Sequence, residues 1–164
     1  MKFRTALIAT ILAASATFGG ARAASSDDSS FVVKAQQDVL GQYALAALAR
    51  GKAGDANAKA LANAVASNAD HANIWLKKYA KAHNVQLEDK PSMRASAQYG
   101  ELQSSKGSSF DKYFARDINV DAQMQLGRFQ DAASSASDPA LKTFAKQQAA
   151  KLEQFSAQAQ KMPH

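Results

Sequence analysis

His71 is the residue of this sequence with the clearest capacity for chemistry. It follows Asp70 in the stretch SNADHANIWLKKY, one helical turn before the single tryptophan, Trp75. At about 100° per residue, Asp70 points away from the apolar face of this segment, and His71 lies on its flank beside Trp75. An imidazole at that place can act as a metal ligand or join a hydrogen-bonded network. His71, and not Asp70, is therefore the residue that could take part in an internal site.

Polar residues interrupt the apolar faces of the predicted helices at a similar distance from one end of the bundle. They are Gln42, Asn68, Asp121, Gln125 and Gln148. Burying such groups without partners costs about 1–3 kcal/mol each, and more for a charge. We therefore predict one buried polar layer across the protein. A His71–Asp121 pair is expected at its centre, with Gln42 and Gln148 as neighbours.

Two kinds of chemistry are open to this layer. The first is a structural hydrogen-bond network, which needs only the side chains themselves. The second is a divalent-metal site with His71 and Asp121 as ligands and amide oxygens as weak additional donors. Metal sites in helical bundles typically use several carboxylates and Glu-x-x-His pairs. This sequence has no Glu-x-x-His, and its three Glu residues lie outside the predicted layer. We favour the network without a cofactor and keep a divalent metal ion as the alternative.

The rest of the sequence assigns no catalytic residue. The chain has no Cys, no glycine-rich phosphate loop and no Ser in a nucleophile motif. His83 falls at the end of a predicted helix, where its charged form would interact with the helix dipole. Asp117, four residues before Asp121, lies at the edge of the apolar face and is predicted to be solvated. These features favour a protein without enzymatic activity.

The elements that must position the polar layer are helices. Val and Ile are few, no stretch alternates for long, and the three Pro stand near expected helix ends. Asp55 and Asp138 are suited to cap helix starts. The predicted long helices span residues 30–53, 56–82, 110–136 and 139–161, and a short extra helix over 91–103 lies in the connection between the second and third. Two tight hairpins and one longer connection predict an all-α, up-down-up-down four-helix bundle.

The first 23 residues have the pattern of a secretory signal peptide. Lys2 and Arg4 precede an uncharged apolar run, and Ala21-Arg22-Ala23 is a small-x-small cleavage site. We expect cleavage after Ala23, a flexible polar leader over residues 24–30 and a single helical-bundle domain over 31–162. Export would place the protein in the periplasm, free or associated with the outer membrane.

Charge and hydropathy restrict the partners of the processed chain. Removal of Lys2, Arg4 and Arg22 leaves 17 basic and 14 acidic residues, a net charge of +3 without a large basic patch. Nucleic-acid binding is therefore not expected. No second long apolar segment follows residue 23, so we predict no transmembrane span in the mature chain. An envelope protein is the expected kind of partner.

Four stretches of the sequence, in this order, resemble a known family. FVVKAQQDVLGQYALAALA, DHANIWL, FDKYF and LKTFAKQQAAKLEQF together resemble the secreted bacterial family called domain of unknown function 4142, often labelled predicted outer membrane protein. The resemblance covers about Phe31 to Ala159. It implies a ferritin-like four-helix bundle and export, and no defined activity.

The same resemblance implies four inward-facing ligand candidates. The family pattern has a Glu on the first long helix, an Asp-His on the second and a His on each of the last two. Only the Asp-His is present, as Asp70-His71. The Glu position falls on Gln42, and the two His positions fall on Asp121 and Phe155. The resemblance therefore implies a degenerate site and lowers the expectation of a metal.

Taken together, these patterns predict an exported helical-bundle protein that acts as a non-enzymatic interaction or envelope-stress protein. The alternative is a metal-binding or metal-dependent redox protein that uses His71 and Asp121.

Overall fold

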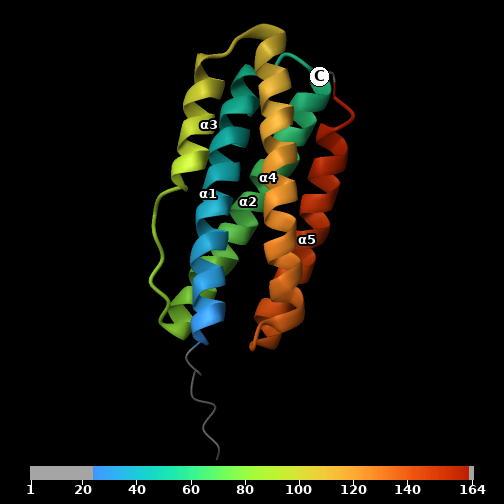
Figure 1. Cartoon of the computed structure of the whole chain (residues 1–164). Coiled ribbons are helices and arrows are strands. Elements are labelled where there is room, and N and C mark those ends of the chain that lie inside the picture. Colours follow the sequence, from blue (N-terminus) through green and yellow to red (C-terminus); the bar gives the residue numbers. More distant parts are fainter. Residues whose placement is uncertain (1–23, 163–164) are drawn as a thin grey trace, which may run out of the picture.

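A computed structural model describes residues 24–162, and every regular element in that range is a helix (Figure 1). The helices are α1 (Ser26–Lys52), α2 (Ala56–His83), α3 (Met93–Ser104), α4 (Gly107–Ser135) and α5 (Pro139–Ala159). The all-α prediction is confirmed, including the short helix between the second and third long ones. The predicted signal peptide lies outside the described residues.

Side-chain caps mark where four of the described helices begin, α1, α2, α3 and α5. Asp55 accepts hydrogen bonds from the backbone N–H groups of Asn57 and Ala58 at the start of α2. Asp138 does the same for the first turn of α5, where a Pro occupies the first helical position. Each such cap stabilises a helix by about 1 kcal/mol. These caps explain why the hairpin turns fall where the sequence predicts them.

The predicted flexible leader over residues 24–30 is mostly helical. Ser25 is the N-cap of α1, so the helix begins four residues earlier than expected. Asp28, in the first turn, is buried because its carboxylate accepts the backbone N–H of Ser137 in the α4–α5 turn. The polar composition of the leader therefore reflects helix capping and a hairpin contact.

The predicted up-down-up-down order is wrong, because α2 and α4 run in the same direction (Figure 1). Asp111, near the start of α4, accepts the backbone N–H groups of Gly54 and Asp55 in the α1–α2 turn. Asp28, at the start of α1, contacts the α4–α5 turn at the other end of the molecule. The two hairpins thus turn at opposite ends, and the long helices have an up-down-down-up order.

The segment between α2 and α4 produces this order because it runs back along α1. Glu88 accepts a hydrogen bond from Gln37, and the Lys52 ammonium donates to the backbone carbonyl of Gln103 further along. An extended stretch of nine residues followed by a 12-residue helix spans roughly 45 Å, about the length of α2. The connection therefore crosses the whole bundle before α4 begins.

α3 lies very close to α1 at Gly41. A Cβ atom added to Gly41 would stand 2.6 Å from the Cβ of Ala95. Within α3 only Ala95 and Leu102 are buried. The position of α3 therefore depends on this close approach and on polar contacts with α4.

We expect Gly41→Ala to lower the free energy of unfolding by about 1–2 kcal/mol, because the added methyl group must displace α3. Gly51→Ala is the matched control, since Gly51 is also in α1 and an added Cβ meets nothing within 4 Å. That substitution should stabilise the protein by up to about 1 kcal/mol through its helix propensity. Urea unfolding measures both values, and hydrogen exchange of α3 locates the effect. Equal effects of the two substitutions would contradict the close packing.

The apolar core is divided into two halves along the bundle axis. One half contains Phe31, Phe129 and Phe144, and the other contains Phe110, Phe114 and Phe155. On α1 the boundary falls between Val39 and Leu45 and includes Gln42. The boundary on α4 falls between Ile118 and Ala122 and includes Asp121. Polar residues therefore mark the middle of the bundle, as the sequence predicts.

None of the helices within residues 24–162 is long and apolar enough to cross a membrane.

Candidate functional site

Two amide pairs form the predicted polar layer. Gln42 of α1 donates from Nε2 to Oε1 of Gln125 on α4 at 2.9 Å, and both residues are buried. Asn68 of α2 donates from Nδ2 to Oε1 of Gln148 on α5, also at 2.9 Å. The expectation that these residues are hydrogen-bonded to one another is confirmed. Each pair joins one helix of the first hairpin to one helix of the second.

Asp121 is buried, with 8% of its surface exposed, but its partners are not those predicted from the sequence. Arg94 of α3 lies 3.0 Å from its carboxylate, and Gln98 of the same helix donates to it at 3.1 Å. Burial raises the pKa of Asp121, and both α3 groups act in the opposite direction. Asp121 therefore attaches α3 to the bundle.

The predicted His71–Asp121 pair does not form. His71 is exposed on α2, between the buried Ala69 and Ala72 positions, whereas the Asp121 carboxylate faces α3. Helical angles placed His71 on the flank of its apolar face, and that flank is at the surface because α2 packs mainly on α1 and α5. Asp70 is exposed, as expected.

Asp38 is a member of the site that the sequence analysis missed. Its side chain is 17% exposed and forms an ion pair with Arg128 of α4. Burial raises the pKa of Asp38 to about 6, the Arg128 charge lowers it, and the nearby Asp121 carboxylate raises it further. The spacing in the sequence could have identified Asp38, because it lies four residues before Gln42 and therefore on the same face of α1. We call Asp38, Arg94, Gln98, Asp121 and Arg128 the Asp121 cluster.

Asp117 is also buried, although the sequence predicted a solvated side chain. It is 3% exposed, and the Arg116 guanidinium donates to its Oδ1. Arg116 also donates to Glu101 of α3 at 2.9 Å. Burial raises the pKa of Asp117. The position is buried because α3 covers this edge of α4, which the helical pattern of α4 alone does not reveal.

A small cavity of about 40 Å³ lies within the Asp121 cluster. Its walls come from α1, α3, α4 and the residue before α3: Asp38, Ser92, Arg94, Ala95, Gln98, Asp121, Met124 and Gln125. A space of this size has room for water and none for an organic substrate. Each of the two buried carboxylates here already has an arginine partner. The cluster can hold water and protons, and it attaches α3.

The family-implied ligand positions do not combine into a metal site. Gln42 is paired with Gln125, Asp121 is paired with α3, and Phe155 is 3% exposed within the apolar half of the core. Among residues 24–162, no three His, Cys, Asp or Glu side chains lie together in a way that could hold a metal ion. The donor set does not fit the predicted metal at His71 and Asp121.

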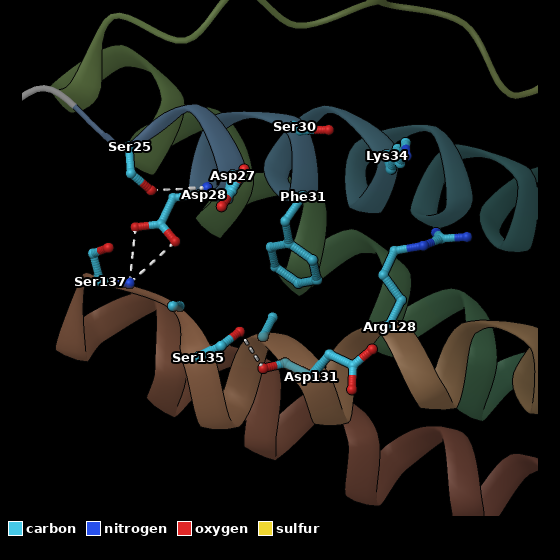
Figure 2. Close-up of a pocket in the computed structure, with 12 residues that line it drawn as sticks. Ser25, Asp27, Asp28, Ser30, Phe31, Lys34, Arg128, Asp131, Ser135 and Ser137 are labelled. Atoms are coloured by element: carbon cyan, nitrogen blue, oxygen red, sulfur yellow. Dashed lines mark hydrogen bonds between the residues drawn. The ribbon is translucent and has the colours of Figure 1, made fainter.

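Two larger cavities lie at the end of the bundle where α1 begins. Figure 2 shows one of about 410 Å³ between α1 and α4, with Phe31 on its wall and Lys34, Arg128 and Asp131 around it. A second, of about 530 Å³, lies beside it and is lined by residues of α1, α2 and the α4–α5 turn. His83 lines this second cavity, stacks on Tyr79 with ring centroids 4.1 Å apart, and lies 3.6 Å from Asp138. His83 therefore has partners beyond the helix dipole proposed from the sequence.

The fold and the polar layer define a small helical-bundle protein made of two hairpins, with a short helix attached to one edge. The chain belongs to the family described as "Domain of unknown function (DUF4142)", whose model matches residues 13–162. This confirms the family resemblance of the sequence. The crystal structure of a DUF305 fragment from Deinococcus radiodurans is similar, with a TM-score of 0.75 and 12% identity over 84% of this chain and 95% of that chain. At this identity the likeness shows the fold alone. No curated protein matches the sequence significantly.

Proposed function

We propose that this chain is an exported, non-enzymatic helical-bundle protein that acts by binding another component of the bacterial envelope. The observation that carries the proposal is the internal pairing of the polar layer. Gln42 donates a hydrogen bond to Gln125, and Asp121 forms an ion pair with Arg94. Two of the positions at which the family resemblance implies ligands, Gln42 and Asp121, thus belong to a structural network, while Phe155 is apolar and His71 lies at the surface. This arrangement supports a function carried by the outer faces.

The N-terminal sequence supports the export part of this proposal. Lys2 and Arg4, the apolar run and the Ala21-Arg22-Ala23 site together have the form of a signal peptide. The first helix begins at Ser26, three residues after the proposed cleavage site. Cleavage after Ala23 would therefore leave the described fold complete.

Cell fractionation tests the export. The full chain should be found in the periplasmic or outer-membrane fraction, with the mass of residues 24–164. A variant with Lys2 and Arg4 replaced by Asp should remain in the cytoplasm at its full mass, because the signal peptide requires a positive n-region. Recovery of both chains in the same compartment would refute the proposal. Crosslinking within intact cells, followed by mass spectrometry, then identifies the envelope partner.

Metal analysis separates this proposal from a metal centre at His71 and Asp121. The processed protein, purified and dialysed against Zn²⁺, Mn²⁺ or Fe²⁺ in turn, is expected to retain less than a stoichiometric amount. His71→Ala should retain the same amount as the unmodified protein, because His71 is exposed and belongs to no group of three ligand side chains among residues 24–162. One metal ion per chain that is lost in both His71→Ala and Asp121→Asn would instead establish the metal centre.

A further inference from the structure

The cavity of about 530 Å³ at the start of α1 is lined by three separate parts of the chain. α1 and the residues before it contribute Ala24, Ser25 and Asp28, while α2 contributes Tyr79 and His83. The remaining wall is the α4–α5 turn and the start of α5, with Ser137, Asp138 and Pro139. The first described residue, Ala24, is partly buried and packs against the neighbouring half of the core. The backbone nitrogen of Ala24 therefore belongs to a residue that lines this cavity.

The cavity carries more negative than positive charge. Two carboxylates, Asp28 and Asp138, line it, and the one basic side chain along this wall is His83, 3.6 Å from Asp138. Asp28 is 4% exposed, and its carboxylate accepts only a neutral backbone N–H from Ser137. A buried carboxylate that lacks a cationic partner is costly, so the site favours an additional positive group.

Tyr79 provides a second observation at this cavity, a buried hydroxyl that has room for a further polar partner. It is 5% exposed, and its hydroxyl is buried at the cavity without a hydrogen bond of good geometry. Burial, together with Asp138 and Asp28, raises the pKa of Tyr79 to about 12, so its hydroxyl lies within the field of both carboxylates. A phenolic oxygen can accept a hydrogen bond as well as donate one. Asp138 already caps α5 and lies beside His83, so Asp28 and the Tyr79 oxygen are the acceptors of this wall that have room for a further donor.

We infer that the occupant of this cavity is the α-ammonium group of Ala24, created when the signal peptide is removed. The inference rests on the proposed function, since it requires cleavage after Ala23. In the unprocessed chain the Ala24 nitrogen is an amide with one hydrogen and no charge. After cleavage it carries three hydrogens and a positive charge, which match the acceptors of Asp28 and the Tyr79 hydroxyl.

Capture of the new terminus would make the folded state sensitive to processing. An ammonium group near a helix start opposes the helix dipole, but the acidic residues Asp27 and Asp28 in the first turn offset this effect. The amine would join α1 to α2 and to the α4–α5 turn in one contact. The processed chain is therefore expected to be more stable than the same fold with a blocked terminus.

The experiment uses the chain of residues 24–164, released from a fusion by a protease that leaves no additional residue. It is compared with the same chain carrying an N-terminal acetyl group and with a chain extended by one Gly. The free terminus should give the highest Tm, and acetylation should lower it by roughly 3 °C. After reductive ¹³C-methylation, the terminal amine should titrate about one unit above its usual range of about 7.7–8.0.

A matched pair of variants identifies the carboxylate. In Asp28→Asn the Tm difference between free and acetylated termini should fall to less than half. Asp27→Asn, which alters the adjacent exposed residue in the same turn, should leave the difference unchanged. Asp28→Asn also alters the contact with Ser137. That change affects the Tm of the free and the acetylated chain alike, so it does not alter the difference between them. Tyr79→Phe removes the hydroxyl, keeps the ring stack on Trp75 and should reduce the difference as well.

Equal Tm values for free and acetylated chains, with the amine titrating in its usual range, would overturn the inference. An exported chain whose mass shows a first residue other than Ala24 would also overturn it, while leaving export itself established. Retention of the full chain in the cytoplasm would refute the proposed function, and the measurements on the released chain do not depend on that result.

Discussion

The unmodified protein is expected to lose about 2–3 kcal/mol of unfolding free energy relative to Asp38→Asn as the pH rises from about 3.5 to 7. The pKa of Asp38 is raised from 3.8 to about 6 in the folded state, chiefly by burial. Below pH 3.8 the carboxyl is protonated in both states and contributes no difference. Between 3.8 and 6 the unfolded chain ionises while the folded chain keeps its proton, so each increase in pH favours unfolding. Above pH 6 the penalty remains constant.

Urea unfolding at a series of pH values measures this difference directly. The Asn side chain at position 38 has nearly the same shape and does not titrate, so its curve lacks this one contribution. Asp117 contributes to both curves and cancels in the comparison, whereas Asp121 interacts with Asp38, so its contribution is included in the measured difference. A carboxyl titration of Asp38 by NMR should give a midpoint near 6. If the unfolding free energies of the two proteins changed in parallel with pH, the ion pair with Arg128 would compensate fully for the burial of Asp38.

Gln42→Leu should lower the free energy of unfolding by about 2 kcal/mol, because it leaves the Gln125 Oε1 atom buried without a donor. The pair is buried on both sides, and its hydrogen bond is 2.9 Å long. Gln125→Leu should have a similar effect, since it leaves the Gln42 amide without an acceptor. The double variant should be close to the unmodified protein, because both polar groups are then absent. The expected coupling energy is about 2–4 kcal/mol.

The pair of Asn68 and Gln148 provides the comparison for this cycle. Its hydrogen bond has the same length but is only partly buried. Water can replace the missing partner there, so Asn68→Leu should cost less than Gln42→Leu. Additive effects at Gln42 and Gln125 would contradict the pairing and would mean that each amide is hydrated separately.

The predicted depth of the polar residues was correct even though the predicted topology was wrong. An up-down-up-down bundle would place both hairpins at the same end. The predicted depth of each polar residue is its distance along the helix from that end. Gln42 and Gln125 each lie near the middle of a long helix, so they meet whether their helices are counted from the same end or from opposite ends. The depth of these amides could therefore be predicted from hydrophobic periodicity, whereas their partners could not. His71 could not be placed in this way, because a residue on the flank of a helix is buried only if a neighbouring helix covers it.

The partners of Asp121 were missed because they come from α3. Arg94 and Gln98 belong to a short helix that buries only Ala95 and Leu102, so it has few apolar positions from which its place in the bundle could be predicted. Asp121 gains its partners, and Asp117 its cover, from the place at which this helix docks, which depends on the close contact at Gly41. A carboxylate next to an undocked α3 would be solvated, as the sequence predicted for Asp117.

The sequence by itself determined the helices, their caps and the polar positions along them, because these depend on residues close together in the chain. Side-chain periodicity, Asp55 and Asp138 at helix starts, and the unfavourable burial of amides are local properties. Only the tertiary structure decided the up-down-down-up order, the pairing of Asp121 with Arg94, and the exposure of His71. Each of these depends on the path of the connection between α2 and α4. A tight connection would make α4 antiparallel to α2, whereas a connection that runs back along α1 makes the two helices parallel. The packing of α3 against Gly41 and α4 favours the second path.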